Sequence, residues 1–145
     1  MHRECIRSTP SWYGHARRDT VAVVIDDNLP GFRGMSSAHI HLFFSFIYDD
    51  KVYPCTLVHW YNTYSRDRDS KTGLWIIRPS YLDVQQLCPH LAVIHLDSVL
   101  RGLHLIPVYG SNAIPAGLKH YSSLDIFKAF YVNRFADYHS NEILF

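Results

Sequence analysis

The sequence lacks most of the features that assign a function directly. No apolar run approaches the length of about 20 residues that a membrane-spanning helix needs, and the polar N-terminal stretch has no apolar segment typical of a signal peptide. The nucleotide-binding patterns GxGxxG and GxxxxGK[ST], the zinc-protease pattern HExxH and the EF-hand loop are also missing. We therefore expect an intracellular protein that binds no cofactor and contacts no membrane.

Cysteine and net charge are scarce as well. Cys5, Cys55 and Cys88 lie far apart, so neither a disulfide framework nor a zinc knuckle is indicated, and a reducing compartment is expected. The formal net charge is only +1, which gives no overall electrostatic basis for binding nucleic acid. Residues 1–18 are an exception and are predicted to form an irregular basic arm, either simply solvated or in contact with nucleic acid. Its arginines are Arg3, Arg7, Arg17 and Arg18.

Apolar and aromatic residues are abundant, and they are concentrated in one stretch. The chain has 145 residues, of which 48% are hydrophobic and 14% aromatic, values typical of one globular domain rich in strands. Residues 38–61, AHIHLFFSFIYDDKVYPCTLVHWY, are predicted to form a long β-hairpin with a polar turn at 49–51. Pro54 cannot donate a ladder hydrogen bond, so it predicts a sheet edge, a bulge or a strand start, and a bend is expected there. The two-residue period places six residues on one apolar face of the first strand: Ala38, Ile40, Leu42, Phe44, Phe46 and Tyr48.

The rest of the chain is predicted to complete a β-barrel around this hairpin. Further strands are expected at 20–25, 74–78, 91–96 and 103–109, with a helical turn within 80–90. Residues 19–110 are thus predicted to form a partly open barrel, and residues 111–145 a linker and a C-terminal helix packed on it. The helix is expected to start at Ser122 or Ser123. Its apolar stripe comprises Leu124, Phe127, Tyr131, Phe135 and Tyr138.

Two groups of side chains are candidates for a site. His39, His41 and His59 fall in the predicted hairpin at a spacing that can chelate a metal ion, although a histidine bonded to the backbone is the commoner state. Aromatic residues near the end of the hairpin and the start of the next strand are the second group. If they meet at one rim they form a cage for methyl-lysine or a groove for a peptide, whereas core packing is their commoner role. These residues are Trp60, Tyr61, Tyr64 and Trp75.

Catalytic chemistry has little support in the sequence. Ser45 and Cys55 are the only nucleophile candidates in the predicted strands, and neither is flanked by glycines as in a nucleophile elbow. The close pairs of aspartates lie in predicted turns, where turn formation explains them better than metal catalysis. We therefore predict no catalytic residue and no metal ligand.

Several blocks of sequence resemble a known family. DTVAVVID (19–26), AHIHLFFSF (38–46), LVHWY (57–61), HLIPVYG (104–110) and FYVNRFADYH (130–139) resemble the C-terminal segment of Plavaka-type transposon-encoded proteins of mushroom-forming fungi. In such proteins the nuclease domain, where a metal-binding carboxylate triad is expected, lies upstream, so the resemblance carries no catalytic residue onto this chain. It implies a detached tail domain that works with upstream transposase domains, or a decayed remnant translated from its own Met1.

A looser resemblance is to bromo-adjacent homology (BAH) domains. The order of TVAVV, AHIHLFF, LVHWY and HLDSVLRGLHL is similar to theirs. This resemblance implies an SH3-like barrel that contacts chromatin or other proteins, and it transfers no cage residue to this chain.

Together these observations predict a non-enzymatic accessory binding module of a transposon-derived polypeptide. Its expected partners are a protein, chromatin or DNA, and its expected location is the nucleus. One alternative is a metal-binding or metal-dependent enzyme domain that uses His39, His41 and His59. A further alternative is a structural remnant that has no ligand.

Overall fold

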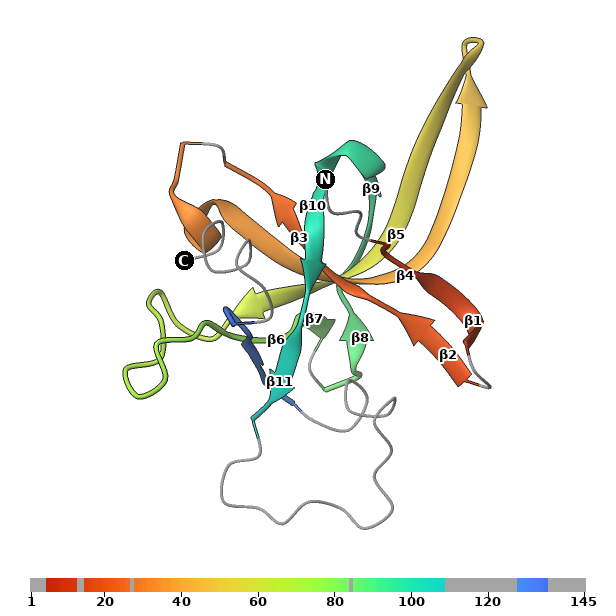
Figure 1. The fold of residues 1–145 in the computed structure, drawn as a ribbon. Helices are drawn as coiled ribbons and strands as arrows, with labels where there is room; N and C mark the ends of the chain where they lie inside the picture. Colours follow the sequence, from red (N-terminus) through yellow and green to blue (C-terminus); the bar gives the residue numbers. More distant parts are fainter. Residues whose placement is uncertain (1–4, 13–14, 27, 84, 109–127, 136–145) are drawn as a thin grey trace.

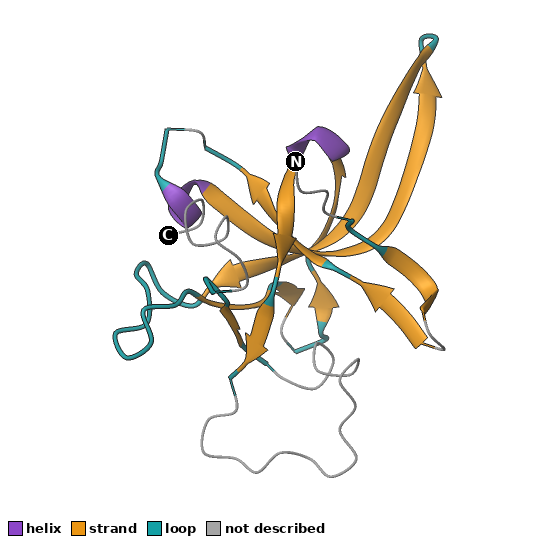
Figure 2. Cartoon of the chain, in the orientation of Figure 1, coloured by secondary structure: helices purple, strands orange, loops and turns teal. Residues whose placement is uncertain are grey.

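The computed structural model describes residues 5–12, 15–26, 28–83, 85–108 and 128–135, and in this part of the chain strands predominate (Figure 2). Two short 3-10 helices, η1 (Gly31–Gly34) and η2 (Leu96–Ser98), accompany them. The strands are β1 (Ser8–Trp12), β2 (His15–Arg18), β3 (Thr20–Val24), β4 (Met35–Tyr48), β5 (Lys51–Thr63), β6 (Ile76–Pro79), β7 (Tyr81–Asp83), β8 (Cys88–Pro89), β9 (Leu91–His95), β10 (Val99–Leu103), β11 (Leu105–Pro107) and β12 (Phe130–Val132).

The main sheet curves into a nearly closed barrel, which confirms the predicted mainly β, barrel-like architecture (Figure 1). Its strand order is β10-β3-β4-β5-β6-β12-β11, and β9 pairs additionally with β5. Strands β10 and β11 follow each other directly in the chain, separated only by His104. One segment, 99–107, therefore pairs with β3 through its first half and with β12 through its second half, and this closes the ring of strands.

The β4–β5 hairpin is the longest element, as predicted. Tyr48 pairs with Lys51, so the turn consists of Asp49 and Asp50 alone, with φ angles of 49° and 60°. Positive φ at both positions is the geometry of a type I′ turn, whose twist matches that of the flanking strands. The outer half of the hairpin extends away from the barrel (Figure 1). Pro54 lies just before the stretch of β5 that pairs with β9, a position at a sheet edge, as expected.

The predicted faces of β4 are wrong beyond His41, because the strand has a β-bulge there. Ile40 pairs with Val58 and Leu42 pairs with the adjacent Leu57, so His41 has no opposite residue and the alternation changes phase there. Beyond the bulge Phe43, and not Leu42, lies on the side of Ile40, and Leu42 is exposed. The six residues predicted to share one apolar face are therefore divided between two faces.

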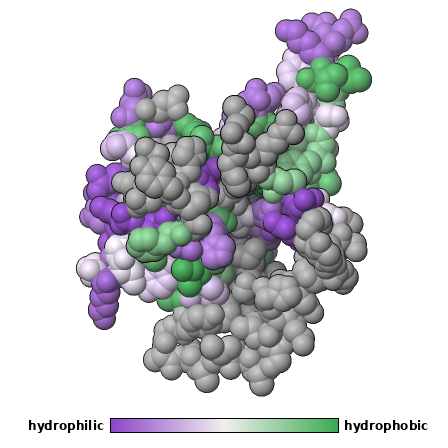
Figure 3. Space-filling model, viewed as in Figure 1, coloured by the Kyte–Doolittle hydropathy of each residue, from purple (hydrophilic) through white to green (hydrophobic). Residues whose placement is uncertain are grey.

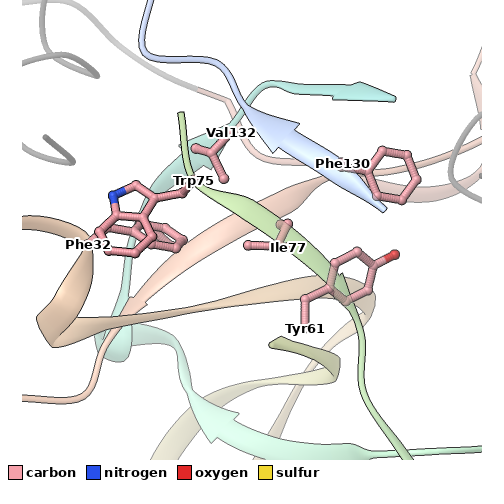
Figure 4. Packing of buried hydrophobic residues seen from close by; sticks show 7 residues of the cluster. Phe32, Tyr61, Trp75, Ile77, Phe130 and Val132 are labelled. Carbon is pink, nitrogen blue, oxygen red and sulfur yellow. The ribbon is translucent and has the colours of Figure 1, made fainter. Parts of the chain in front are cut away.

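Buried residues form two cores, one on each side of the β3–β4–β5 sheet. The barrel core lies inside the ring of strands (Figure 4), with Met35, Leu103 and Leu105 packed against it. The outer core lies on the opposite face, where Ile6, Ala92 and Ile94 contribute to its cover. The residues of the barrel core are Ala22, Phe32, Tyr61, Trp75, Ile77, Phe130 and Val132. Those of the outer core are Val21, Val23, Ala38, Ile40 and Val58.

Three predicted segments differ from the structure. The N-terminal arm is not irregular in its described part, because β1 and β2 pair as an antiparallel hairpin. The helical turn predicted within 80–90 is wrong, because β7 pairs with β8 there. The C-terminal helix is wrong at Phe130–Val132, which form β12 between β6 and β11. The remainder of that predicted helix, apart from residues 128, 129 and 133–135, lies outside the described residues.

Candidate functional site

The four aromatic residues predicted to form a rim do not meet. Tyr61 and Trp75 are buried in the barrel core, where the Trp75 ring lies 5.6 Å from that of Phe32. Trp60 points to the other side of β5 and packs against the outer core. Tyr64 is 63% exposed, and the Arg78 guanidinium lies 5.3 Å from the centre of its ring. The arrangement therefore forms no aromatic cage.

The three candidate metal-ligating histidines do come together on one face of the hairpin. The ring centres of His39 and His41 are 5.3 Å apart, and those of His41 and His59 are 6.1 Å apart. Nε2 of His39 lies 3.0 Å from the carbonyl oxygen of Arg18, and Nε2 of His59 lies 2.8 Å from the carbonyl oxygen of Ser80. Two of the three rings are thus held by the backbone. Within the described ranges no group of three His, Cys, Asp or Glu side chains is arranged to hold a metal ion.

His41 is the electrostatically unusual member of this cluster. Burial lowers the pKa of His41 below its ordinary value, and the neighbouring His59 and Arg18 lower this pKa further. All three effects disfavour a positive charge on the ring. His41 is therefore held neutral in the folded protein to a lower pH than an exposed histidine would be.

The arginines of the predicted basic arm are engaged in local structure where the chain is described. Nε of Arg17 donates to Asp19 at 2.9 Å, and the backbone N–H of Arg7 donates to the same carboxylate at 2.9 Å. Nε of Arg18 donates to the carbonyl oxygen of His41 at 3.3 Å. These bonds attach the β1–β2 hairpin to the start of the main sheet. Arg3 lies outside the described residues.

A polar pocket of about 460 Å³ lies beside the barrel core at the ends of β4 and β5. Phe32 and Tyr61 line it together with Ser36, Asn62 and Arg78. Ser37 also contributes to its wall, and the hydroxyl of this residue is buried without a hydrogen-bond partner among the described residues. The volume is sufficient for a small molecule. No sequence pattern predicted this pocket, because its lining comes from three separate segments.

An exposed apolar surface lies on the outer half of the β4–β5 hairpin, residues 42–53, which we call the ribbon. Figure 3 shows hydrophobic residues along it and hydrophilic residues at its tip. The tip carries Asp49, Asp50 and Lys51. The exposed apolar residues of the ribbon are Leu42 at 53%, Phe46 at 47%, Ile47 at 74%, Tyr48 at 71% and Val52 at 63%.

The ribbon is held as a pair of strands by its own side chains. The rings of Phe46 and Tyr53, which are directly opposite each other, stack with centres 5.2 Å apart. Cross-strand aromatic pairs of this kind stabilise an antiparallel ladder by about 0.2–1 kcal/mol. The ribbon is thus a formed element with an apolar surface. The residue pattern predicted the strands but not their exposure.

No helix in the described part of the chain is long and apolar enough to cross a membrane. Comparison with protein-family models, with curated proteins and with solved structures finds no match to this chain.

Proposed function

We propose that the chain is a non-enzymatic binding module that contacts another protein through the ribbon. The observation that carries this proposal is the exposure of five large apolar side chains on one projecting hairpin. Large apolar patches on a folded surface are typical of protein interaction sites. A preformed strand pair also reduces the ordering cost of association, because its backbone is fixed before a partner arrives.

Charge favours a protein partner over DNA. Binding to nucleic acid depends on several cations placed against phosphates. The ribbon carries one lysine and two aspartates, all of them at its tip. Arg17 is already paired with Asp19 at 2.9 Å. A protein surface with an apolar groove or a free sheet edge is the partner that this composition fits.

We also propose the finer identities that the two resemblances imply. The barrel would be SH3-like, and the chain would be an accessory module of a transposon-derived polypeptide that acts in the nucleus. Support for the barrel type comes from the order of strands β3, β4 and β5 and from ring closure by the segment 99–107. A chromatin protein remains the partner class that the BAH resemblance implies.

Selection of random twelve-residue peptides on immobilised protein tests the binding proposal. The expected result is enrichment of apolar, strand-forming peptides, and loss of their binding to the variant Ile47→Lys/Val52→Lys. The control variant Lys71→Glu changes charge in an exposed loop away from the ribbon and should bind as the unmodified chain does. Peptides that bind the ribbon variant equally well would contradict the proposal. A mobility-shift assay with random-sequence duplex DNA should show no retardation at micromolar concentration.

The exposed ribbon also fits a second candidate, a structural remnant in which these residues once packed against upstream domains. Such a remnant would have no ligand of its own. Failure of the peptide selection, together with soluble expression improved by Ile47→Lys/Val52→Lys, would favour this alternative.

A further inference from the structure

The longer open backbone edge of the ribbon lies along β4. Strand β3 pairs with β4 from Met35 to His39. The carbonyl oxygen of His41 then accepts bonds from the Ser8 hydroxyl at 2.7 Å and from Arg18. Beyond this point, among the residues that the structure describes, no strand pairs with the outer edge of residues 42–48. This segment, LFFSFIY, combines aromatic and branched residues with no charge and no proline, which is the composition of an edge that readily pairs with another strand.

The opposite edge of the ribbon is short, because only residues 51–53 of β5 lie between the turn and Pro54. Strand β9 pairs with β5 from Cys55 to His59. The next residue towards the tip is Pro54, which has no N–H to donate. Pairing through the β4 edges alone gives a closed two-chain complex, whereas pairing through both edges of each ribbon would allow an unlimited fibre.

Charges are distributed unevenly along the ribbon. The tip carries Asp49 and Asp50, both exposed. The base carries Arg18, whose guanidinium donates to the carbonyl oxygen of His41. Within one chain these groups are about 25 Å apart, because Asp49 lies eight positions after His41 along an extended strand. Two ribbons that lie side by side in opposite directions bring these groups of the two chains together.

We propose that two copies of this chain associate through the outer edges of their β4 strands, antiparallel and with a two-fold axis at Ser45. This inference rests on the proposed function and names the partner of the ribbon. The pairing sets Ser45 against the partner's Ser45 and Phe44 against the partner's Phe46, a cross-strand aromatic pair. Asp49 then lies opposite the partner's His41, beside the positive charge of Arg18.

Cysteine cross-linking tests the register. In a background with Cys5→Ser and Cys88→Ser, which removes the exposed thiols, Ser45→Cys places two sulfurs on the axis. Directly opposite residues have Cα atoms about 4.5–5.5 Å apart, within the range for a disulfide. The control Ile47→Cys lies on the same exposed edge, but its two copies would be about 13 Å apart in this register.

Mild oxidation should therefore link Ser45→Cys chains rapidly and Ile47→Cys chains slowly. Non-reducing electrophoresis measures both rates, and the product should have twice the 16.9 kDa mass of one chain. Equal rates for the two variants, or no product from either, would overturn the register and with it the proposal.

A double-mutant cycle tests the charge contact without any cross-link. Arg18→Ala and Asp49→Asn/Asp50→Asn should each weaken dimerisation by about three- to tenfold, because each removes two symmetry-related exposed ion pairs. Asparagine tolerates the positive φ of the turn, so the hairpin is preserved. The combined variant should be no weaker than either single variant. Additive effects would show that the two sites do not meet.

Sedimentation velocity over a wide concentration range gives the dimerisation constants and separates this inference from the proposed function. A chain that stays monomeric at high micromolar concentration refutes the dimer. If that monomer still selects peptides that bind through Ile47 and Val52, the binding module stands and its partner is a different protein. Loss of both properties refutes both.

Discussion

Replacing Phe130 by alanine should destabilise the fold strongly, although residues 128–135 are far in sequence from the other strands. Phe130 has no exposed surface and packs inside the barrel with Tyr61, their rings 6.4 Å apart. Replacing a fully buried phenylalanine by alanine costs about 3–5 kcal/mol, because the free energy gained by burying the ring is lost and a cavity is left in the core. The expected fall in melting temperature is about 6–20 °C for a domain of this size.

Tyr131→Ala is the matched control, because its effect on stability differs between a strand and a helix at residues 130–132. In β12, Phe130 and Val132 face the barrel core, while the intervening Tyr131 is half-buried on the other side. A helix with the stripe predicted from the sequence would instead make Tyr131 the central packing residue. The strand therefore predicts a cost of about 1 kcal/mol for Tyr131→Ala.

Urea unfolding followed by tryptophan fluorescence measures both variants, and Trp75 in the barrel core reports on the relevant region. A change within about 1 kcal/mol for Phe130→Ala would refute the packing of β12 inside the barrel. A larger cost for Tyr131→Ala than for Phe130→Ala would refute the strand itself.

Four further substitutions test local features of the fold. Gly34→Ala should be severely destabilising, because a Cβ there would lie 2.3 Å from the carbonyl oxygen of Asp26. At Gly73 a Cβ would meet no atom, so Gly73→Ala should cost only roughly 1–2 kcal/mol, which is the strain of an alanine at a φ of +71°. Thermal unfolding of the two variants compares these costs. Leu87 is exposed and has a φ of 52°, a conformation that glycine adopts without strain. Leu87→Gly should therefore raise the free energy of unfolding by about 1 kcal/mol. The lowered pKa of His41 means that the unfolded chain binds this proton more tightly, so stability should fall as pH drops below about 6.5. In urea titrations across that range the fall should be smaller for His41→Gln, and an unchanged slope would contradict the assignment.

Local patterns predicted the strands whose signals are contained in a few residues. The alternating or continuous apolar runs at 20–25, 38–61 and 91–96 correspond to β3, the β4–β5 hairpin and β9. The hairpin needed only its turn residues and flanking aromatics, because its two strands are neighbours in sequence. Such elements are recoverable from a single sequence.

The errors arose where distant residues decide the structure. Phe130–Val132 are apolar at a spacing that suits a helix, and they become a strand because β6 and β11 provide hydrogen-bonding partners on both sides. The bulge at His41 has no sequence marker, and it reverses the faces of everything that follows in β4. Residue propensities predict neither the pairing of residues 130–132 nor the bulge at His41.

In the candidate site, too, features that depend on neighbouring residues could be predicted, whereas features that depend on distant ones could not. Trp60 and Tyr61 were predicted to share a rim, but they are consecutive in β5, and the alternation of a strand puts their side chains on opposite faces. The approach of His59 to His39 was anticipated, because the predicted hairpin brings the two strands together, and the structure pairs these residues directly. The exposure of Leu42, Phe46 and Ile47 could not be predicted, because buried and projecting strands have the same composition and differ only in what covers them.

Closure of the barrel by the segment 99–107 has a consequence for how the protein folds. Its first half pairs with Thr20–Val24, about eighty residues earlier, and its second half pairs with Phe130–Val132. Contacts of such long sequence separation form slowly, because much chain entropy must be lost before they form. During synthesis the β4–β5 hairpin can form early, while the ring must wait for residue 132. A nascent chain therefore leaves barrel-core residues such as Phe32 and Tyr61 exposed until residue 132 has been made, and this is the stage at which a chaperone would engage it.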